Sequence, residues 1–193
     1  MARNCYSLGF SSGTMAAGLA GGSPVLAIRW ANTGSVCVLR SLRLSAGSLV
    51  GFTAGLVKFD LFTARAWSAA DTDGGAVAWT VAGSGKRTAG AASSAFVSGS
   101  EIRVSTTATL SAGTRTLDTS PLATLCTSVA NTAGGPIIPP MTQLVPGYPD
   151  HPIVLSAASA ATSTGLVLQA TVPATGTWHF SLAMDWEEMD TFV

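Results

Sequence analysis

Charged residues are scarce in this sequence. Lysine and arginine together number 10, aspartate and glutamate also number 10, and the formal net charge is zero. Charged residues therefore make up 10% of the chain, compared with about 25% in typical soluble domains. So few charges leave no basic patch for nucleic acid or for anionic lipid. A neutral surface also does little to keep copies of the chain apart, so self-association is expected.

Cysteine and histidine are also rare. Cys5, Cys37 and Cys126 are too few and too far apart to form a disulfide framework or a CxxC metal motif. We expect reduced thiols that act mostly as small core residues, in a compartment such as a cytoplasm. The only histidines are His151 and His179, and no GxSxG motif accompanies them. We interpret both as structural and predict no catalytic, cofactor-binding or metal-ligating residue.

Long apolar runs are missing as well. The longest uncharged apolar stretch in the first half of the chain, residues 44–57, is interrupted by Ser and Gly. It is shorter than the ~20 residues that a membrane-spanning helix needs. The N-terminal residues have no continuous apolar core, so a secretory signal is not expected.

Strict alternation of apolar and polar residues is present near the C-terminus, in residues 177–189 (TWHFSLAMDWEEM). One face of a strand would carry five large apolar side chains: Trp178, Phe180, Leu182, Met184 and Trp186. The other face would carry His179, Asp185 and Glu187 among smaller residues. A period of two indicates a β-strand with one buried face. This strand follows a turn signal at residues 173–176 and is expected to pair with residues 165–172 in a hairpin.

Similar strand patterns recur along the chain, whereas helical periodicity is rare. Strands are expected at residues 25–31, 35–44, 56–66, 76–81, 101–110, 153–156, 165–172 and 177–189. The first two are expected to form a hairpin, and residues 117–130 fit either a short helix or a strand. About eight such strands predict an all-β fold, a single jelly-roll-like β-sandwich.

Two segments fall outside this pattern. Residues 1–24 are rich in Gly, Ser and Ala and are expected to form an extended N-terminal arm. The β-sandwich domain would then span residues 25–193. Within it, residues 135–152 form a proline-rich loop, because proline cannot donate to a sheet ladder. The arm and this proline-rich excursion are the expected contact elements.

Three motifs suggest chemistry but fit structural roles better. Residues 83–88 (GSGKRT) lack the spacing and the following helix of a phosphate-binding loop. Residues 71–75 (DTDGG) lack the later ligands of a calcium loop and are expected to form a turn. Asp185 and Glu187 could lie as close as a glycosidase carboxylate pair. A solvated acidic end, or a contact to an arginine of another subunit, fits them and their neighbours Glu188 and Asp190 better.

The five tryptophans are expected to be core anchors, with an exposed carbohydrate platform as the alternative. They are Trp30, Trp67, Trp79, Trp178 and Trp186.

Three stretches together resemble small β-rich structural proteins of tailed bacteriophage virions. They are RWANTGSVCVLRSLRL, FTAGLVKFDLFTARAWSAADTDGGA and GLVLQATVPATGTWHFSLAMDWEEM. The resemblance extends from about residue 28 onward and has no site motif, so it implies no functional residues. It implies a non-enzymatic protein that is made in the host cytoplasm, binds the outside of a capsid and stabilises it. The expected partners are the major capsid protein and copies of the chain itself.

The resemblance leaves a second function open. A tail, neck or fibre β-domain could share this pattern and bind a host-surface glycan. Such a domain would need an exposed aromatic side chain, such as Trp67, in a shallow groove. A hydrolase would instead need a polar cleft with perturbed acids.

Overall fold

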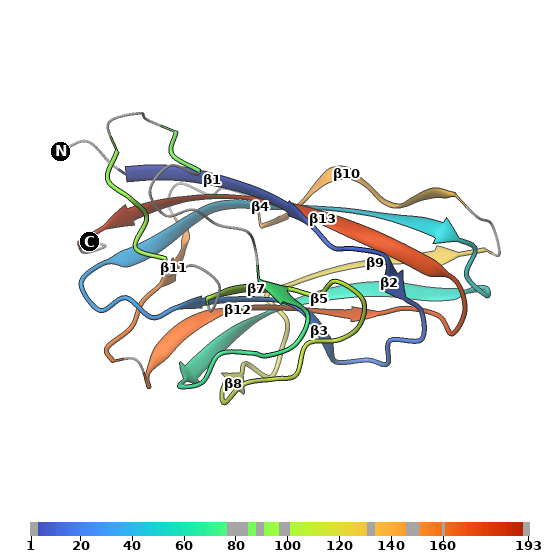
Figure 1. Cartoon of the computed structure of the whole chain (residues 1–193), viewed down its shortest axis with the longest axis horizontal. Helices are drawn as coiled ribbons and strands as arrows, with labels where there is room; N and C mark the ends of the chain where they lie inside the picture. Colours follow the sequence, from blue (N-terminus) through green and yellow to red (C-terminus); the bar gives the residue numbers. More distant parts are fainter. Residues whose placement is uncertain are drawn as a thin grey trace.

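The computed structural model describes residues 4–76, 85–87, 91–96, 101–130, 134–145, 151–159 and 161–190. Within these residues every regular element is a β-strand, and all strand pairs are antiparallel. The strands form two sheets, A and B, that lie one above the other (Figure 1). The all-β sandwich predicted from the sequence is confirmed. No helix in this part of the chain is long and apolar enough to span a membrane.

Sheet A contains both the first and the last strand of the chain. Its order is β1 (Asn4–Ser11), β13 (Thr177–Met189), β4 (Val36–Val50) and β10 (Gly135–Val145). Two short strands join it, β2 (Met15–Ala16) beside β13 and β11 (Ile153–Leu155) beside β4.

Sheet B is built from the middle of the chain. Its order is β6 (Gly75–Ala76), β7 (Ile102–Val104), β3 (Ser23–Trp30), β12 (Ser163–Thr171), β5 (Gly55–Trp67) and β8 (Thr116–Leu117). A further strand, β9 (Ala123–Val129), pairs with the first half of β5.

The apolar face of β13 forms the centre of the core, as its alternation predicts. Burial alternates along the strand from Thr177 to Met189, and all five large apolar side chains are buried. The indole of Trp178 lies edge-on to Phe59 of sheet B, with ring centroids 5.7 Å apart. At the other end of β13, Trp186 stacks on Tyr6 of β1 at 5.3 Å. The Trp178–Phe59 contact joins the two sheets, and the Trp186–Tyr6 contact joins two strands of sheet A. Aromatic contacts of this kind add stability beyond buried area.

A smaller apolar cluster lies on the opposite side of sheet B. Trp67, Ala64 and Val167 pack there with Leu110. The guanidinium of Arg115 lies 4.9 Å from the Trp67 ring centroid and pairs with the buried Asp71. Burial lowers the pKa of Arg115 to about 10. Because this cluster covers the outer face of sheet B, residues of β3 and β12 are buried on both faces.

The two predicted hairpins are wrong. β3 belongs to sheet B while β4 belongs to sheet A, and β12 and β13 are divided in the same way. In both cases a short connection crosses from one sheet to the other, so consecutive strands face each other across the core. Alternation tells which face of a strand is buried, but it does not tell which strand is its hydrogen-bonded neighbour.

The predicted N-terminal arm is also corrected. Residues Asn4–Ser11 form β1, which pairs with β13 along its full length, from Asn4 opposite Glu188 to Ser11 opposite Ser181. Tyr6 of β1 is fully buried in the main core.

The proline-rich segment differs from the sequence prediction as well. Its first part is β10, which pairs with β4 despite Pro136, Pro139 and Pro140. The pairing shifts register between Pro136 and Ile138 and again between Ile138 and Thr142. Prolines are tolerated at bulges of an edge strand because no ladder hydrogen bond is lost there. Residues 146–150 of the predicted excursion lie outside the described part of the chain.

Candidate interaction surface

Asp185 is the centre of a polar network on the outer face of sheet A. Its carboxylate accepts hydrogen bonds from Ser7 of β1 at 2.5 Å and from Ser41 of β4 at 2.7 Å. It also pairs with Arg43 at 2.8 Å and with Arg87 at 2.7 Å. Burial by itself would raise the pKa of Asp185, but these hydrogen bonds and guanidinium charges outweigh it and lower the pKa. The network joins three neighbouring strands to the segment 85–87.

The other acidic residues of β13 are engaged in the same way. Glu187 pairs with Arg40 of β4 at 2.7 Å. Glu188 points to the inner side and is only 8% exposed. Its carboxylate accepts hydrogen bonds from Ser94 Oγ at 2.5 Å, from the Ala95 backbone N–H at 2.8 Å and from Trp186 Nε1 at 3.0 Å.

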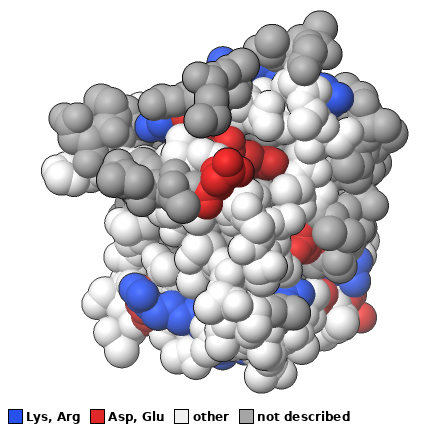
Figure 2. All heavy atoms as spheres, turned by 90° about the vertical axis from the view of Figure 1, so that its left-hand side faces the viewer, with Lys and Arg blue, Asp and Glu red and all other residues white. Residues whose placement is uncertain are grey.

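These contacts change the interpretation of the acidic cluster. Neither a solvated end nor an arginine from another subunit is needed, because the arginines come from the same chain. Figure 2 shows Asp and Glu side chains gathered at the end of the sandwich where β13 ends, with Lys and Arg side chains nearby. Asp185 and Glu187 each lie against a guanidinium, so they hold strands together rather than line an open cleft.

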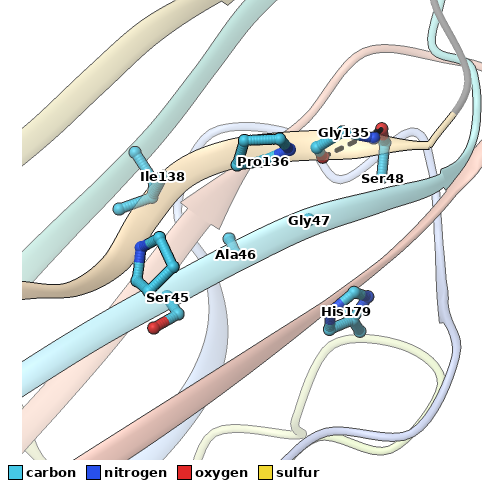
Figure 3. A pocket seen from close by; sticks show the side chains of 9 residues that line it. Ser45, Ala46, Gly47, Ser48, Gly135, Pro136, Ile138 and His179 are labelled. Atoms are coloured by element: carbon cyan, nitrogen blue, oxygen red, sulfur yellow. Dashed lines mark hydrogen bonds between the residues drawn. The ribbon is translucent and has the colours of Figure 1, made fainter.

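His179 lies at a shallow hollow in the outer face of sheet A. The hollow has a volume of about 260 Å³ and is lined by His179, by residues 45–48 of β4 and by β10 (Figure 3). A Cβ added to Gly47 would come within 2.9 Å of the His179 Cε1 atom. The missing side chain at Gly47 therefore makes room for the imidazole.

The irregular course of β10 forms the other wall of this hollow. Ile138 and Pro140 line it, and the bulge that follows brings Met141 to a positive φ of 59°. The backbone N–H of Met141 donates to Ser45 Oγ at 2.8 Å, which fixes the bulge against β4. A second hollow of about 160 Å³ adjoins the first at Ser48, Gly135 and Pro136. The walls of the first hollow are mainly small and apolar, whereas the exposed lining of the second is mainly polar.

Three connections without charge meet at one end of the sandwich. They are residues 17–22, 51–54 and 172–176, none of which contains Lys, Arg, Asp or Glu. Contacts tie these connections together: the Gly18 backbone N–H donates to the Pro173 carbonyl at 2.7 Å, and the Thr53 backbone N–H donates to Thr175 Oγ1 at 2.9 Å. We call this region the uncharged end; it lies on the right in Figure 1.

The uncharged end also exposes apolar side chains. Leu49, Val50 and Leu56 are 47%, 56% and 51% exposed, at the end of β4 and the beginning of β5. Among the described residues, the other exposed large apolar side chains are Leu122 and Met141. Exposed apolar side chains that gather at one place are typical of interaction sites. Sequence reasoning missed this surface, because no strand was expected between residues 44 and 56.

The four tryptophans in the described part of the chain occupy the core, as predicted. Trp30, Trp67 and Trp178 are fully buried and Trp186 is 1% exposed. Trp79 lies outside the described residues. The four described indoles therefore provide no exposed platform.

The remaining sequence motifs have structural positions. Residues 71–75 form the expected turn, with positive φ at Asp73 and Gly74, and Asp71 faces inward. Gly85, Lys86 and Arg87 form a β-bridge beside β1, while residues 83, 84 and 88 lie outside the described part. No group of three or more His, Cys, Asp or Glu residues suited to a metal occurs among the described residues. His151 is exposed next to the undescribed residues 146–150.

The cysteines differ from one another in environment. Cys37 is a buried thiol in the core, as predicted, and burial raises its pKa well above the usual value. Cys5 is partly buried on β1. Cys126 is an exposed thiol in the middle of β9, so it is not a core residue.

No protein-family model, no curated protein and no solved structure matches this chain.

Proposed function

We propose that this chain is a structural virion protein of a tailed bacteriophage that binds the outside of the capsid shell in several copies and stabilises it. The partners are the major capsid protein and other copies of the chain. The observation that carries the proposal is the uncharged end, where Leu49, Val50 and Leu56 are exposed on a rigid sandwich. The sequence resemblance to phage structural proteins supports the same function.

The strand order supports a jelly roll, a fold that capsid proteins use repeatedly. The eight longer strands, taken in chain order, are β1, β3, β4, β5, β9, β10, β12 and β13. The first pairs with the last, the second with the seventh, the third with the sixth and the fourth with the fifth. Nested pairing of this kind is what results when one long antiparallel ribbon is rolled into two sheets.

Binding through the uncharged end is weak for a single copy. Covering three half-exposed apolar side chains is worth about 1 kcal/mol each, before the entropy cost of association is subtracted. A contact of about 3 kcal/mol corresponds to a dissociation constant above ~1 mM. Linked copies on a repeating shell convert such contacts into lasting attachment. This is why several copies are part of the proposal.

Substitution of the uncharged end tests the proposal. Val50→Asp and Leu56→Asp place a carboxylate where the shell would cover it, and each should reduce co-sedimentation with shells of the encoding phage at least tenfold. Met141→Asp is the matched control, because Met141 is 49% exposed on a different part of the surface. Its binding should equal that of the unchanged protein.

Two outcomes would overturn the proposal. In the first, all three variants bind as well as the unchanged protein. In the second, only Met141→Asp loses binding, which would move the contact to the bulge of β10. Thermal unfolding of each variant separates lost binding from lost folding.

Glycan binding by a tail or fibre component is less well supported. A glycan platform is usually aromatic, and the four described tryptophans are buried. The hollow beside His179 is lined mainly by small side chains and prolines. A shell-binding role is better supported, because the uncharged end exposes apolar side chains that a shell protein could cover.

A further inference from the structure

Among the longer edge strands in the described part of the chain, β9 is the one whose outer edge has no proline, register shift or bridging segment. Its residues Ala123–Val129 pair with Leu61–Gly55 of β5 on one side. No other strand in the described part of the chain pairs with the opposite side. In an antiparallel pair, every second residue directs its N–H and C=O away from its partner. The open edge therefore presents backbone groups that can accept another strand.

The other long edge strands, β1 and β10, are each protected over part of their length. β1 is covered at Cys5–Ser7, where the Ser7 N–H donates to the Gly85 carbonyl at 2.6 Å and the Arg87 N–H donates to the Cys5 carbonyl at 3.0 Å. β10 has three prolines and shifts register repeatedly. β7 is paired on its outer side by β6. Such protection is the usual way in which proteins prevent unwanted strand pairing.

The sequence of β9, ATLCTSV, has no charge and no proline to prevent pairing. Its inner side chains are only partly covered: Ala123, Leu125 and Val129 pack against the core but remain partly exposed. Its outer side chains, Thr124, Cys126 and Ser128, are small and exposed. A strand added at this edge would complete the burial of the inner residues. At Ser128 and Val129 it would lie next to Gly135 and Pro136 of β10, which line a hollow with them.

We propose that β9 pairs antiparallel with β9 of a second copy of this chain, about a two-fold axis at Cys126. This register is the one that pairs all seven residues of both strands. It places inner residues opposite inner residues, with Leu125 across from Thr127 and Ala123 across from Val129. On the outer face, Thr124 lies across from Ser128, and the two Cys126 residues face each other.

The second copy is the occupant that these features favour. The pattern of β9 is complementary to itself, which is what a two-fold interface requires. The formal net charge of zero adds no repulsion between copies. The pairing would join the two B sheets into one continuous sheet. This inference rests on the self-association included in the proposed function and assigns it a surface.

Cross-linking of Cys126 tests the register directly. Cysteines directly opposite each other on antiparallel strands are close enough to form a disulfide. With diamide, which accepts the two electrons and two protons released by two thiols, the unchanged protein should form a covalent dimer rapidly. Cys126→Ser should remove this dimer, which excludes a contribution from Cys5 or Cys37.

Moved cysteines provide the matched control. In the Cys126→Ser background, Thr124→Cys alone should not form a dimer, because residue 124 faces residue 128 of the other copy. A mixture of Thr124→Cys and Ser128→Cys chains should form a mixed dimer at least tenfold faster than either chain forms its own. Equal rates for all pairs would indicate random collision and would overturn the proposal.

Charge substitutions test the same surface without a cross-linking reaction. Thr124→Lys combined with Ser128→Lys places like charges opposite each other and should make the protein monomeric by light scattering. Thr124→Lys combined with Ser128→Glu places opposite charges across the interface and should restore the dimer. A monomeric unchanged protein at high concentration would overturn the proposal. These experiments contain no shells, so their failure would leave shell binding to its own test.

Discussion

The indole N–H of Trp186 donates a 3.0 Å hydrogen bond to the carboxylate of Glu188, two residues further along β13. Both side chains point into the sandwich, because residues i and i+2 of a strand share a face. The same carboxylate holds Ser94 and the Ala95 backbone, so a buried acid anchors residues 94–95 to the last strand.

Replacing Glu188 by Ala is expected to destabilise the protein by about 3 kcal/mol or more, because each buried donor left without a partner costs about 1–3 kcal/mol. Urea unfolding followed by tryptophan fluorescence measures the change. Asp190→Ala is the control, since Asp190 is exposed just beyond β13. If the two variants are equally stable, Glu188 does not anchor this segment.

Asp185 is expected to make the protein sensitive to acid. Its pKa in the folded protein lies below the usual 3.8, so folding favours the carboxylate over the acid. The stabilisation is complete above about pH 4 and is lost as the pH falls through the lower pKa of the folded state.

Unfolding measured between neutral pH and strong acid checks this expectation. Asp185→Asn should be less stable than the unchanged protein at neutral pH, and the difference should shrink as the pH falls below about 4. Asp118→Asn is the comparison. Arg65 lowers the pKa of Asp118 as well, but this pair is exposed, so its change in stability with pH should be much smaller. A difference that stays constant with pH would show that the charge of Asp185 is not the cause.

Gly165 of β12 leaves room for a close approach between strand and indole. A Cβ at this position would lie 2.1 Å from the Ile28 carbonyl oxygen and 2.6 Å from Cζ3 of Trp67. We expect Gly165→Ala to lower the free energy of unfolding by about 1–3 kcal/mol, since neither neighbour can move freely. In Gly9→Ala, the added methyl meets nothing within 4 Å, and thermal unfolding should show little change.

The fold class was predictable because a strand with one solvent-exposed face alternates apolar and polar residues in its sequence. Thr177–Met189 matches its predicted bounds, since five bulky residues of one parity permit no other arrangement. The same parity places Glu188 on the inner face. This was not predicted, because Glu188 was grouped with the neighbouring acidic residues as part of a solvated end. Strand partners were not predictable, since a turn between two strands can either close a hairpin or cross to the opposite sheet.

The candidate surfaces were harder to foresee. Leu49 and Val50 extend β4 beyond its expected end, and nothing local indicates that three uncharged connections meet beside them. β10 pairs with β4 because bulges accommodate its prolines. Composition alone argues against this pairing, since a proline-rich segment is expected to be a loop. The open edge of β9 becomes visible only once its neighbours are known, because being an edge is a property of the sheet and not of the strand.

The position of β13 between β1 and β4 has a consequence for biosynthesis. Strand β1 must wait for β13, more than 160 residues later, before it finds its neighbour, since Asn4 lies opposite Glu188. Contacts between such distant parts of a chain form slowly, and a ribosome still holding residues 177–189 cannot release a finished sheet A. We therefore expect sheet A to form in the nascent chain only after β13 has been translated, in a single step.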